Sequence, residues 1–207
     1  MYIINEANFT REISVPNLTS SQSGNAENLN KYGDEKPRLL LQNSLGSVLF
    51  TDLDWQVTNG ILDNDADQKW KDLVNGKEYD GKVWKGLNYE EGSFKVSLLA
   101  YFTYWNWLSD SLSSNLQVQV KNAENVNDTN SLVSVWNTFI QMYQGGFCQA
   151  NKRVYNIHGT TFVDWSGGNI SNYVNLLQFL QDNPNDYPNP QLYNFGNSSN
   201  SNSLGLW

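Results

Sequence analysis

The sequence holds one histidine and one cysteine, the residue types that most often supply a general base or a nucleophile. His158 stands among aromatic residues, a setting typical of a structural, hydrogen-bonding histidine. Cys148 is expected to be a small buried apolar residue, and a single cysteine cannot form an internal disulfide. Because zinc sites are built chiefly from several His and Cys ligands, this composition argues against one.

Three alternating aspartates, Asp63, Asp65 and Asp67, resemble the opening of a calcium-binding loop. That loop needs glycine at its sixth position and glutamate at its twelfth, where this sequence has Gln68 and Val74. We therefore interpret the aspartates as the acidic start of a helix, since carboxylates interact favourably with the positive end of the helix dipole.

Glu90 and Glu91 form a second candidate pair, of the kind that glycoside hydrolases use. Adjacent residues on a loop normally point apart, so a shared site is not expected. The enzymatic alternative is a hydrolase that combines Glu90, Glu91 or Asp164 with His158, and the substitution His158→Ala would abolish its activity. The phosphate-loop, dinucleotide and nucleophile-elbow glycine motifs are absent. We predict that the chain is not an enzyme and binds neither cofactor nor metal.

The composition favours a member of an assembly. Charged residues make up 16% of the 207 residues, where typical soluble domains have about 25%, so the surface relies on neutral polar groups that carry no charge-desolvation cost. The net charge is −8, and the 13 basic residues are scattered, whereas gripping nucleic acid needs basic clusters. Specific binding of DNA is therefore not expected. An acidic surface repels DNA, which suits a passage for DNA and not a clamp around it. No apolar stretch reaches the roughly 20 residues of a membrane span.

The pattern along the chain predicts a mainly α fold: a helical bundle with a short β or extended N-terminal arm and an extended C-terminal tail. Residues 1–35 are assigned to the arm and a loop, 36–182 to the helical domain and 183–207 to the tail. Loose alternation of apolar residues over 1–20 favours one or two short strands or an extended arm. Pro37 suits the first turn of the first helix.

Apolar residues at three- and four-residue steps predict the helices. These are 36–57 with a kink at Gly46, a short helix through Trp70 and Val74, 93–113 with Ser93 as its cap, 129–149, and a last one around 170–180. The glycine-rich segment 77–92 is typical of a hairpin or an irregular loop. Residues 114–127 suit a short strand or an extended crossing, and 152–165 show little periodicity.

The tail is rich in Pro, Asn and Ser and has no periodicity, so it cannot bury enough apolar surface to fold alone. Its large apolar residues are nevertheless too many for a solvated linker, and we predict that they order against a neighbour. These candidate assembly-interface residues are Tyr187, Leu192, Tyr193, Phe195, Leu206 and Trp207.

Three segments, 32–53, 69–114 and 120–146, resemble in order and spacing the head–tail connector (adaptor, or ring) proteins of tailed bacteriophages, most closely those of crAss-like and other Bacteroidetes phages. The motifs that carry the resemblance are Leu45-Gly46; Trp70, Leu73, Gly76 and Tyr79; Gly86-Leu87 before Tyr101 to Trp105; Asn122–Asn125; and Trp136-Asn137. The sequence departs from the pattern after Gly146.

The resemblance implies a structural subunit that packs into a homo-oligomeric ring, commonly of twelve copies, between the portal and the tail. Its partners would be the portal and other connector or tail proteins, with DNA passing through the lumen. Its location would be the neck or tail of the virion, and the host cytoplasm during assembly. The alternative is a carbohydrate-binding or adhesin module of a tail structure, suggested by 8 Trp and 11 Tyr, although such modules are usually β-sandwiches.

Overall fold

The computed structural model describes residues 1–15, 24–116, 125–145, 172–193 and 195. The fold is α-rich, with 54% of residues in helices. Within the described ranges the strands form three antiparallel pairs of two strands each. None of the helices described is long and apolar enough to cross a membrane.

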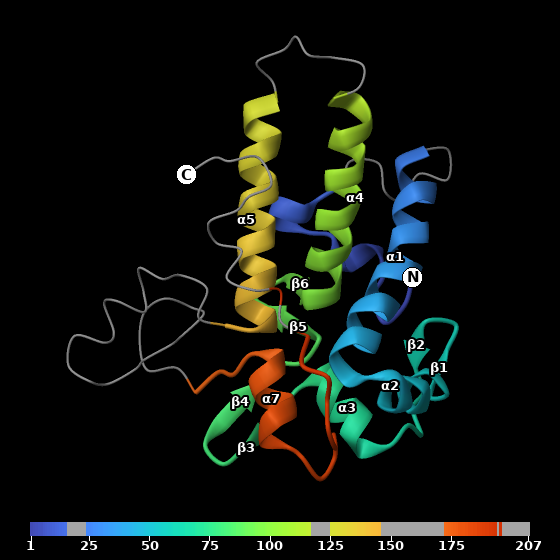
Figure 1. The fold of residues 1–207 in the computed structure, drawn as a ribbon, viewed down its shortest axis with the longest axis vertical. Coiled ribbons are helices and arrows are strands. Elements are labelled where there is room, and N and C mark those ends of the chain that lie inside the picture. Colours follow the sequence, from blue (N-terminus) through green and yellow to red (C-terminus); the bar gives the residue numbers. More distant parts are fainter. Residues whose placement is uncertain (16–23, 117–124, 146–171, 194, 196–207) are drawn as a thin grey trace, which may run out of the picture.

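Three long helices run along the longest axis of the molecule (Figure 1). They are α1 (Gly24–Leu45), α4 (Leu98–Leu116) and α5 (Asn125–Tyr143), and α4 contacts both of the others. Leu40 and Leu41 of α1, Leu99 of α4 and Phe139 of α5 are fully buried. The apolar core therefore continues from one helix to the next, and the shorter elements gather at the lower end of the molecule.

Residues 1–15, the described part of residues 1–20, contain neither of the short strands that the sequence suggests. They form two 3₁₀ turns, η1 (Glu6–Asn8) and η2 (Arg11–Ile13). Asn5 caps the first turn, accepting a hydrogen bond from the Ala7 N–H, while the Asn8 side chain accepts one from the Asn5 N–H. The alternating apolar residues are buried because the turns fold against the helices, and not because they line one face of a sheet.

Helix α1 begins at Gly24, so the expected boundary between an arm and a helical domain at residue 36 falls inside a helix. Pro37 lies in the interior of that helix and not in its first turn. Proline has no N–H, which leaves the carbonyl four residues earlier without its helical partner. That carbonyl, on Gly33, accepts a hydrogen bond of 2.8 Å from the Tyr2 N–H instead. The proline thus creates a docking point for the N-terminal segment.

The kink expected at Gly46 is a complete break between α1 and α2 (Ser47–Asp54). Gly46 has a φ of +81°, a left-handed conformation that glycine adopts without steric cost. A short hairpin of β1 (Val57–Thr58) and β2 (Ile61–Leu62) follows. Its turn residues, Asn59 and Gly60, both have positive φ, as the tightest hairpins require.

The short helix expected through Trp70 is confirmed as α3 (Gln68–Asn75), which ends at Gly76. The hairpin expected next is also confirmed, as β3 (Lys77–Tyr79) paired with β4 (Lys82–Trp84). The last described helix, α7 (Leu176–Asp182), packs beside this hairpin (Figure 1). Val83 bridges Tyr173, which precedes α7. The helix expected around 170–180 is found only from Leu176 to Asp182, because Tyr173 is extended and pairs with Val83.

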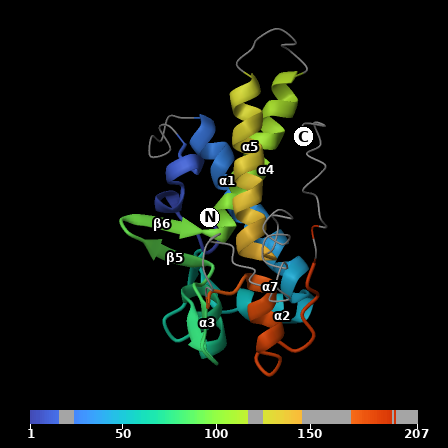
Figure 2. The ribbon, with the colours of Figure 1, turned by 90° about the vertical axis from the view of Figure 1, so that its left-hand side faces the viewer.

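Residues 93–97 are not helical, contrary to the predicted helix over 93–113. The third hairpin, β5 (Asn88–Glu91) with β6 (Phe94–Ser97), runs directly into α4 and projects from the side of the molecule (Figure 2). The cap of α4 is Ser97, whose hydroxyl accepts a hydrogen bond of 3.3 Å from the Ala100 N–H. Ser93 precedes the strand and has no capping role for this helix.

The segment 114–127, expected to be extended, is helical at both of its described ends, because α4 continues to Leu116 and α5 starts at Asn125. Helix α5 occupies most of the predicted helix over 129–149, and Gly145, with a φ of +65°, follows its end. The segment 152–165, His158, Cys148 and Asp164 lie outside the described residues.

Candidate assembly interface

The described residues of the predicted tail interface lie in different environments: Tyr187 in the core, Phe195 in an aromatic cluster, and Leu192 and Tyr193 in the segment between them. Tyr187 is 0% exposed, enclosed by its own chain, and its hydroxyl donates a hydrogen bond to the Lys69 carbonyl. Its ring contacts Trp70 and Phe179, with centroids 5.8 and 5.5 Å away. Tyr187 is therefore a core residue that is not accessible to a partner. Leu206 and Trp207 lie outside the described residues.

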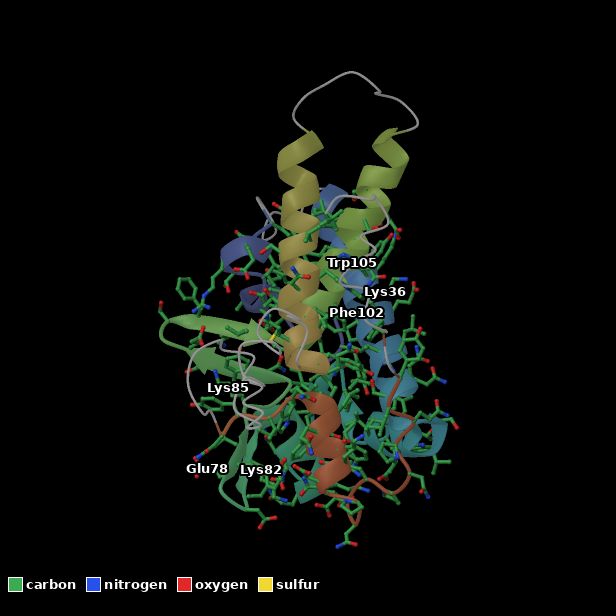
Figure 3. All side chains as sticks on the ribbon, turned by 60° about the vertical axis from the view of Figure 1, so that its left-hand side comes forward. Lys36, Glu78, Lys82, Lys85, Phe102 and Trp105 are labelled. Atoms are coloured by element: carbon green, nitrogen blue, oxygen red, sulfur yellow. The ribbon has the colours of Figure 1, made fainter. Side chains whose placement is uncertain are left out.

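Phe195 is the centre of an aromatic cluster between α4 and α5. Its ring centroid lies 5.0–5.9 Å from those of four residues, which we call the aromatic cradle. The cradle consists of Phe102, Trp136, Phe139 and Tyr143. Figure 3 shows Phe102 one turn before Trp105 on α4. The Trp105 ring packs on the Trp136 ring, with their centroids 4.4 Å apart. Aromatic pairs at these separations stabilise beyond the area they bury.

Residues 188–193 together with Phe195 are here called the C-terminal strap. Three hydrogen bonds hold the strap against the helices. The Tyr143 hydroxyl donates to the Tyr193 carbonyl at 2.7 Å, and the Phe195 N–H donates to the Gln144 side chain at 3.2 Å. The Leu192 N–H donates to the Ser44 carbonyl at 3.2 Å. The strap therefore lies across the ends of α1 and α5, while Tyr193 itself is 48% exposed.

A second apolar surface lies on α2 and was not singled out from the sequence. Val48 and Trp55 are 82% and 83% exposed, and their seven-residue spacing places them on one face of the helix. Leu49 and Leu53, on the other face, are buried. We call Val48 and Trp55 the α2 apolar face. The sequence shows that apolar residues occupy more positions of α2 and its C-cap, Trp55, than one buried face can take, but not which of them stay exposed.

A broad open hollow of about 1030 Å³ lies between the N-terminal turns, the β1–β2 hairpin, α3 and β5. Asparagine is the commonest residue in its lining: Asn5, Asn8, Asn30, Asn59, Asn64, Asn75 and Asn88. The Asn88 amide donates to the Ile3 carbonyl at 2.6 Å, and its oxygen is buried with no hydrogen-bond partner. The hollow thus presents amide groups together with the charged Glu6, Asp63, Lys71, Glu90 and Lys95, and sequence reasoning missed it because its residues are scattered along the chain.

Two of the three alternating aspartates, Asp63 and Asp67, have structural partners. Asp63 accepts a hydrogen bond from Thr58 at 3.1 Å, and the side chain of Gln56 bonds both the amide and the carboxylate of Asp67. These contacts join the start of α3 to the β1–β2 hairpin; Asp67 is the N-cap residue, but the first turn of α3 itself contains no acidic residue, so the expected acidic start lies just before the helix. Among the residues described, no group of three or more His, Cys, Asp or Glu is placed to hold a metal ion.

Glu91 forms an ion pair with Arg11 at 2.5 Å and another with Lys85 at 3.7 Å. The hydrogen bond from Arg11 lowers the pKa of the Glu91 carboxyl. Glu90 is exposed, and because neighbouring residues on the strand β5 point to opposite faces, the structure does not bring the two carboxylates into one site. The Arg11–Glu91 pair instead ties the N-terminal turns to the β5–β6 hairpin.

Buried tyrosines dominate the electrostatics of the core. Burial raises the pKa of Tyr143 to about 12, and a hydrogen bond to Asp110 raises the pKa of Tyr32 to about 12. Burial also raises the pKa of Tyr2, Tyr89, Tyr101 and Tyr187. These phenols are neutral at physiological pH and act as packing and hydrogen-bonding groups.

No protein-family model, no curated protein and no solved structure matches this chain. The functional assignment therefore depends on the residues and their arrangement.

Proposed function

We propose that the chain is a structural subunit of a phage head–tail connector, which packs in several copies into a ring between portal and tail around the DNA channel. The observation that carries the proposal is the α2 apolar face, where a tryptophan and a valine lie more than four-fifths exposed. Large exposed apolar groups on a mostly neutral polar surface are typical of interaction sites. The likeness of residues 32–146 to connector proteins supplies the kind of assembly.

A ring requires a heterologous contact, in which one surface of a subunit fits a different surface of the next. The α2 apolar face and the C-terminal strap lie on different elements, which supports a contact of this kind. The net charge of −8 suits a channel through which DNA slides without sticking. The α-rich fold, including its helical bundle and C-terminal tail, would then serve to hold these surfaces at fixed positions.

The first test removes the exposed tryptophan. Because Trp55 is exposed in the single chain but covered in the proposed ring, Trp55→Ser should leave the circular dichroism spectrum unchanged and reduce self-association at least tenfold. Light scattering after size exclusion, with and without the portal protein, measures this. Leu39→Ser, at a half-exposed leucine on α1, is the matched control. Association unaffected by Trp55→Ser would remove the main support for the proposal.

Electron cryo-microscopy of the phage particle provides the second test. The proposal expects several copies of this chain arranged around the channel between portal and tail. A particle whose neck lacks the chain would contradict it.

The asparagine-lined hollow favours one other function, that of a carbohydrate-binding or adhesin module. Amide side chains pair with sugar hydroxyls, and the exposed Asn59 and Asn64 line this hollow. The usual β-sandwich of such modules is not found among the described residues, whose strands form only two-stranded pairs. Binding to a glycan array that is lost on Asn64→Ala, with Asn185→Ala at an exposed asparagine outside the hollow as control, would favour this function over the ring.

A further inference from the structure

The C-terminal strap is fixed at its two ends and held lightly between them. At one end Tyr187 is locked in the core against Trp70, and at the other Phe195 fills the aromatic cradle. Pro188, Asn189 and Gln191 between them are exposed. Two hydrogen bonds join the backbone of this stretch to the rest of the described chain, from the Leu192 N–H to the Ser44 carbonyl and from the Tyr143 hydroxyl to the Tyr193 carbonyl.

The turn that brings Phe195 back onto its own chain requires two unfavourable backbone conformations. Asn189 has a φ of +53° and Leu192 a φ of +47°. Asparagine tolerates this left-handed region, but leucine does not, because its Cβ then crowds the following carbonyl. Pro188 and Pro190 disfavour the helical region for the residues before them and favour an extended course. An extended strap would relieve the strain and carry Phe195 away from its own cradle.

The cradle itself is independent of the strap. All four of its rings belong to α4 and α5, and the two side chains that bond the strap backbone near Phe195, Tyr143 and Gln144, belong to α5 or directly follow it. A Phe195 from a second copy would therefore make the same ring contacts and hydrogen bonds as the chain's own. Exchange of an identical element between copies needs no new surface.

We infer that the C-terminal strap is exchanged between copies: in the assembled protein Phe195 of one subunit fills the aromatic cradle of the next. The exchange is directional, since each copy gives a strap to one neighbour and receives a strap from the other. In the proposed ring the exchanged strap would link each subunit to the next, and this part of the inference rests on the proposed function. Exchange between two copies can also occur without a ring.

The test asks whether the strap lies in the same chain or in a neighbouring one. Two full-length chains are co-expressed in a Cys148→Ser background, a tagged one with Gln144→Cys and an untagged one with Tyr193→Cys, and treated with a short bismaleimide. Tyr193 is exposed and its carbonyl bonds the residue before Gln144, so the two cysteines lie close in space. Gln144→Cys removes one of the three strap hydrogen bonds but leaves the four ring contacts of Phe195 in place. In this mixture only a strap from the other chain can be cross-linked.

We expect a cross-linked heterodimer on a denaturing gel, reduced at least fivefold when the Tyr193→Cys chain also carries Phe195→Ala. A chain with both cysteines should likewise give ladders of linked copies. Links confined to single chains, or no links at all, would overturn the exchange. If the protein forms rings but both cysteines link only within one chain, the exchange is wrong and the proposed function stands. If heterodimers are linked but no rings form, the exchange stands and the proposed function is contradicted.

Discussion

At the scale of single residues, two of the motifs behind the connector resemblance contact each other, the one with Leu73 and Gly76 and the pair Gly86-Leu87. The Leu73 carbonyl accepts hydrogen bonds from the Trp84 indole at 2.9 Å and from the Leu87 N–H at 3.1 Å. Gly76 and Gly86 lie back to back there: an added Cβ on Gly76 would meet the Trp84 carbonyl at 2.6 Å, and one on Gly86 the Val74 carbonyl at 2.6 Å. These motif residues therefore hold α3 against the segment that follows β4.

We predict that Gly86→Ala lowers the free energy of unfolding by roughly 3 kcal/mol, as left-handed strain and overpacking add. Gly81→Ala is the matched control, because Gly81 is also left-handed with a φ of +74° but has open space around it. It should cost about 1 kcal/mol, from strain alone. Urea titration measures both, and equal costs would show that the close backbone approach is not important.

At the scale of elements, the sequence predicts the elements whose periodicity is set by their own buried face, such as α3 and most of α4 and α5. It misses the first half of α1, because residues 24–36 contain few apolar side chains and only Leu29 among those described is fully buried. That half is stabilised from outside, by the N-terminal segment bound at Gly33. Such tertiary support leaves no local pattern to detect.

At the strand β6 the sequence-based prediction is wrong for a different reason: the pattern of apolar residues fits both a helix and a strand. Phe94, Leu98 and Tyr101 have helical spacing, yet Phe94 and Val96 also alternate with polar residues as a strand does. Pairing with β5 decides for the strand, because the ladder supplies hydrogen bonds that an exposed helix start would lack.

The two interpretations of this segment differ in which serine caps α4. We predict that Ser97→Ala destabilises the protein by about 1 kcal/mol, since it removes the acceptor for the Ala100 N–H. Ser93→Ala should change stability by less than about 0.5 kcal/mol, as expected of a surface substitution. Thermal melts of the two variants compare them directly. A larger effect at Ser93 would restore the helix as the sequence predicts it.

At the scale of the whole molecule, the sequence predicts the kind of surface better than its location. The tail aromatics are recognisable as groups that must be covered, but only the fold shows that Tyr187 is covered by its own chain and Phe195 by α4 and α5. The α2 apolar face escapes detection because Val48 and Trp55 look like core residues of a helix. Which face of a helix is left over depends on packing that no local spacing records.

The buried tyrosines predict a loss of stability in alkali. An unfolded chain releases phenolic protons near pH 10, whereas the pKa of about 12 for Tyr143 keeps its proton in the folded state. Stability is therefore fully present below about pH 10 and falls as pH rises toward 12, by about 1.4 kcal/mol per pH unit for each such tyrosine. Tyrosinate absorbance and circular dichroism should change together.

The variant Tyr143→Phe should make this dependence shallower, because one phenol with a raised pKa is removed. Tyr193→Phe, at a half-exposed tyrosine, is the control. Tyrosines that ionise near pH 10 while the helical signal persists would contradict the prediction.

The burial of Tyr187 against Trp70 has a consequence for biosynthesis. The hydrogen bond from Tyr187 to Lys69 spans 118 positions, so α3 cannot complete its packing until Tyr187 has been synthesised and has left the ribosome. A nascent chain that stops short of Tyr187 would leave one side of the Trp70 ring uncovered and be open to proteolysis.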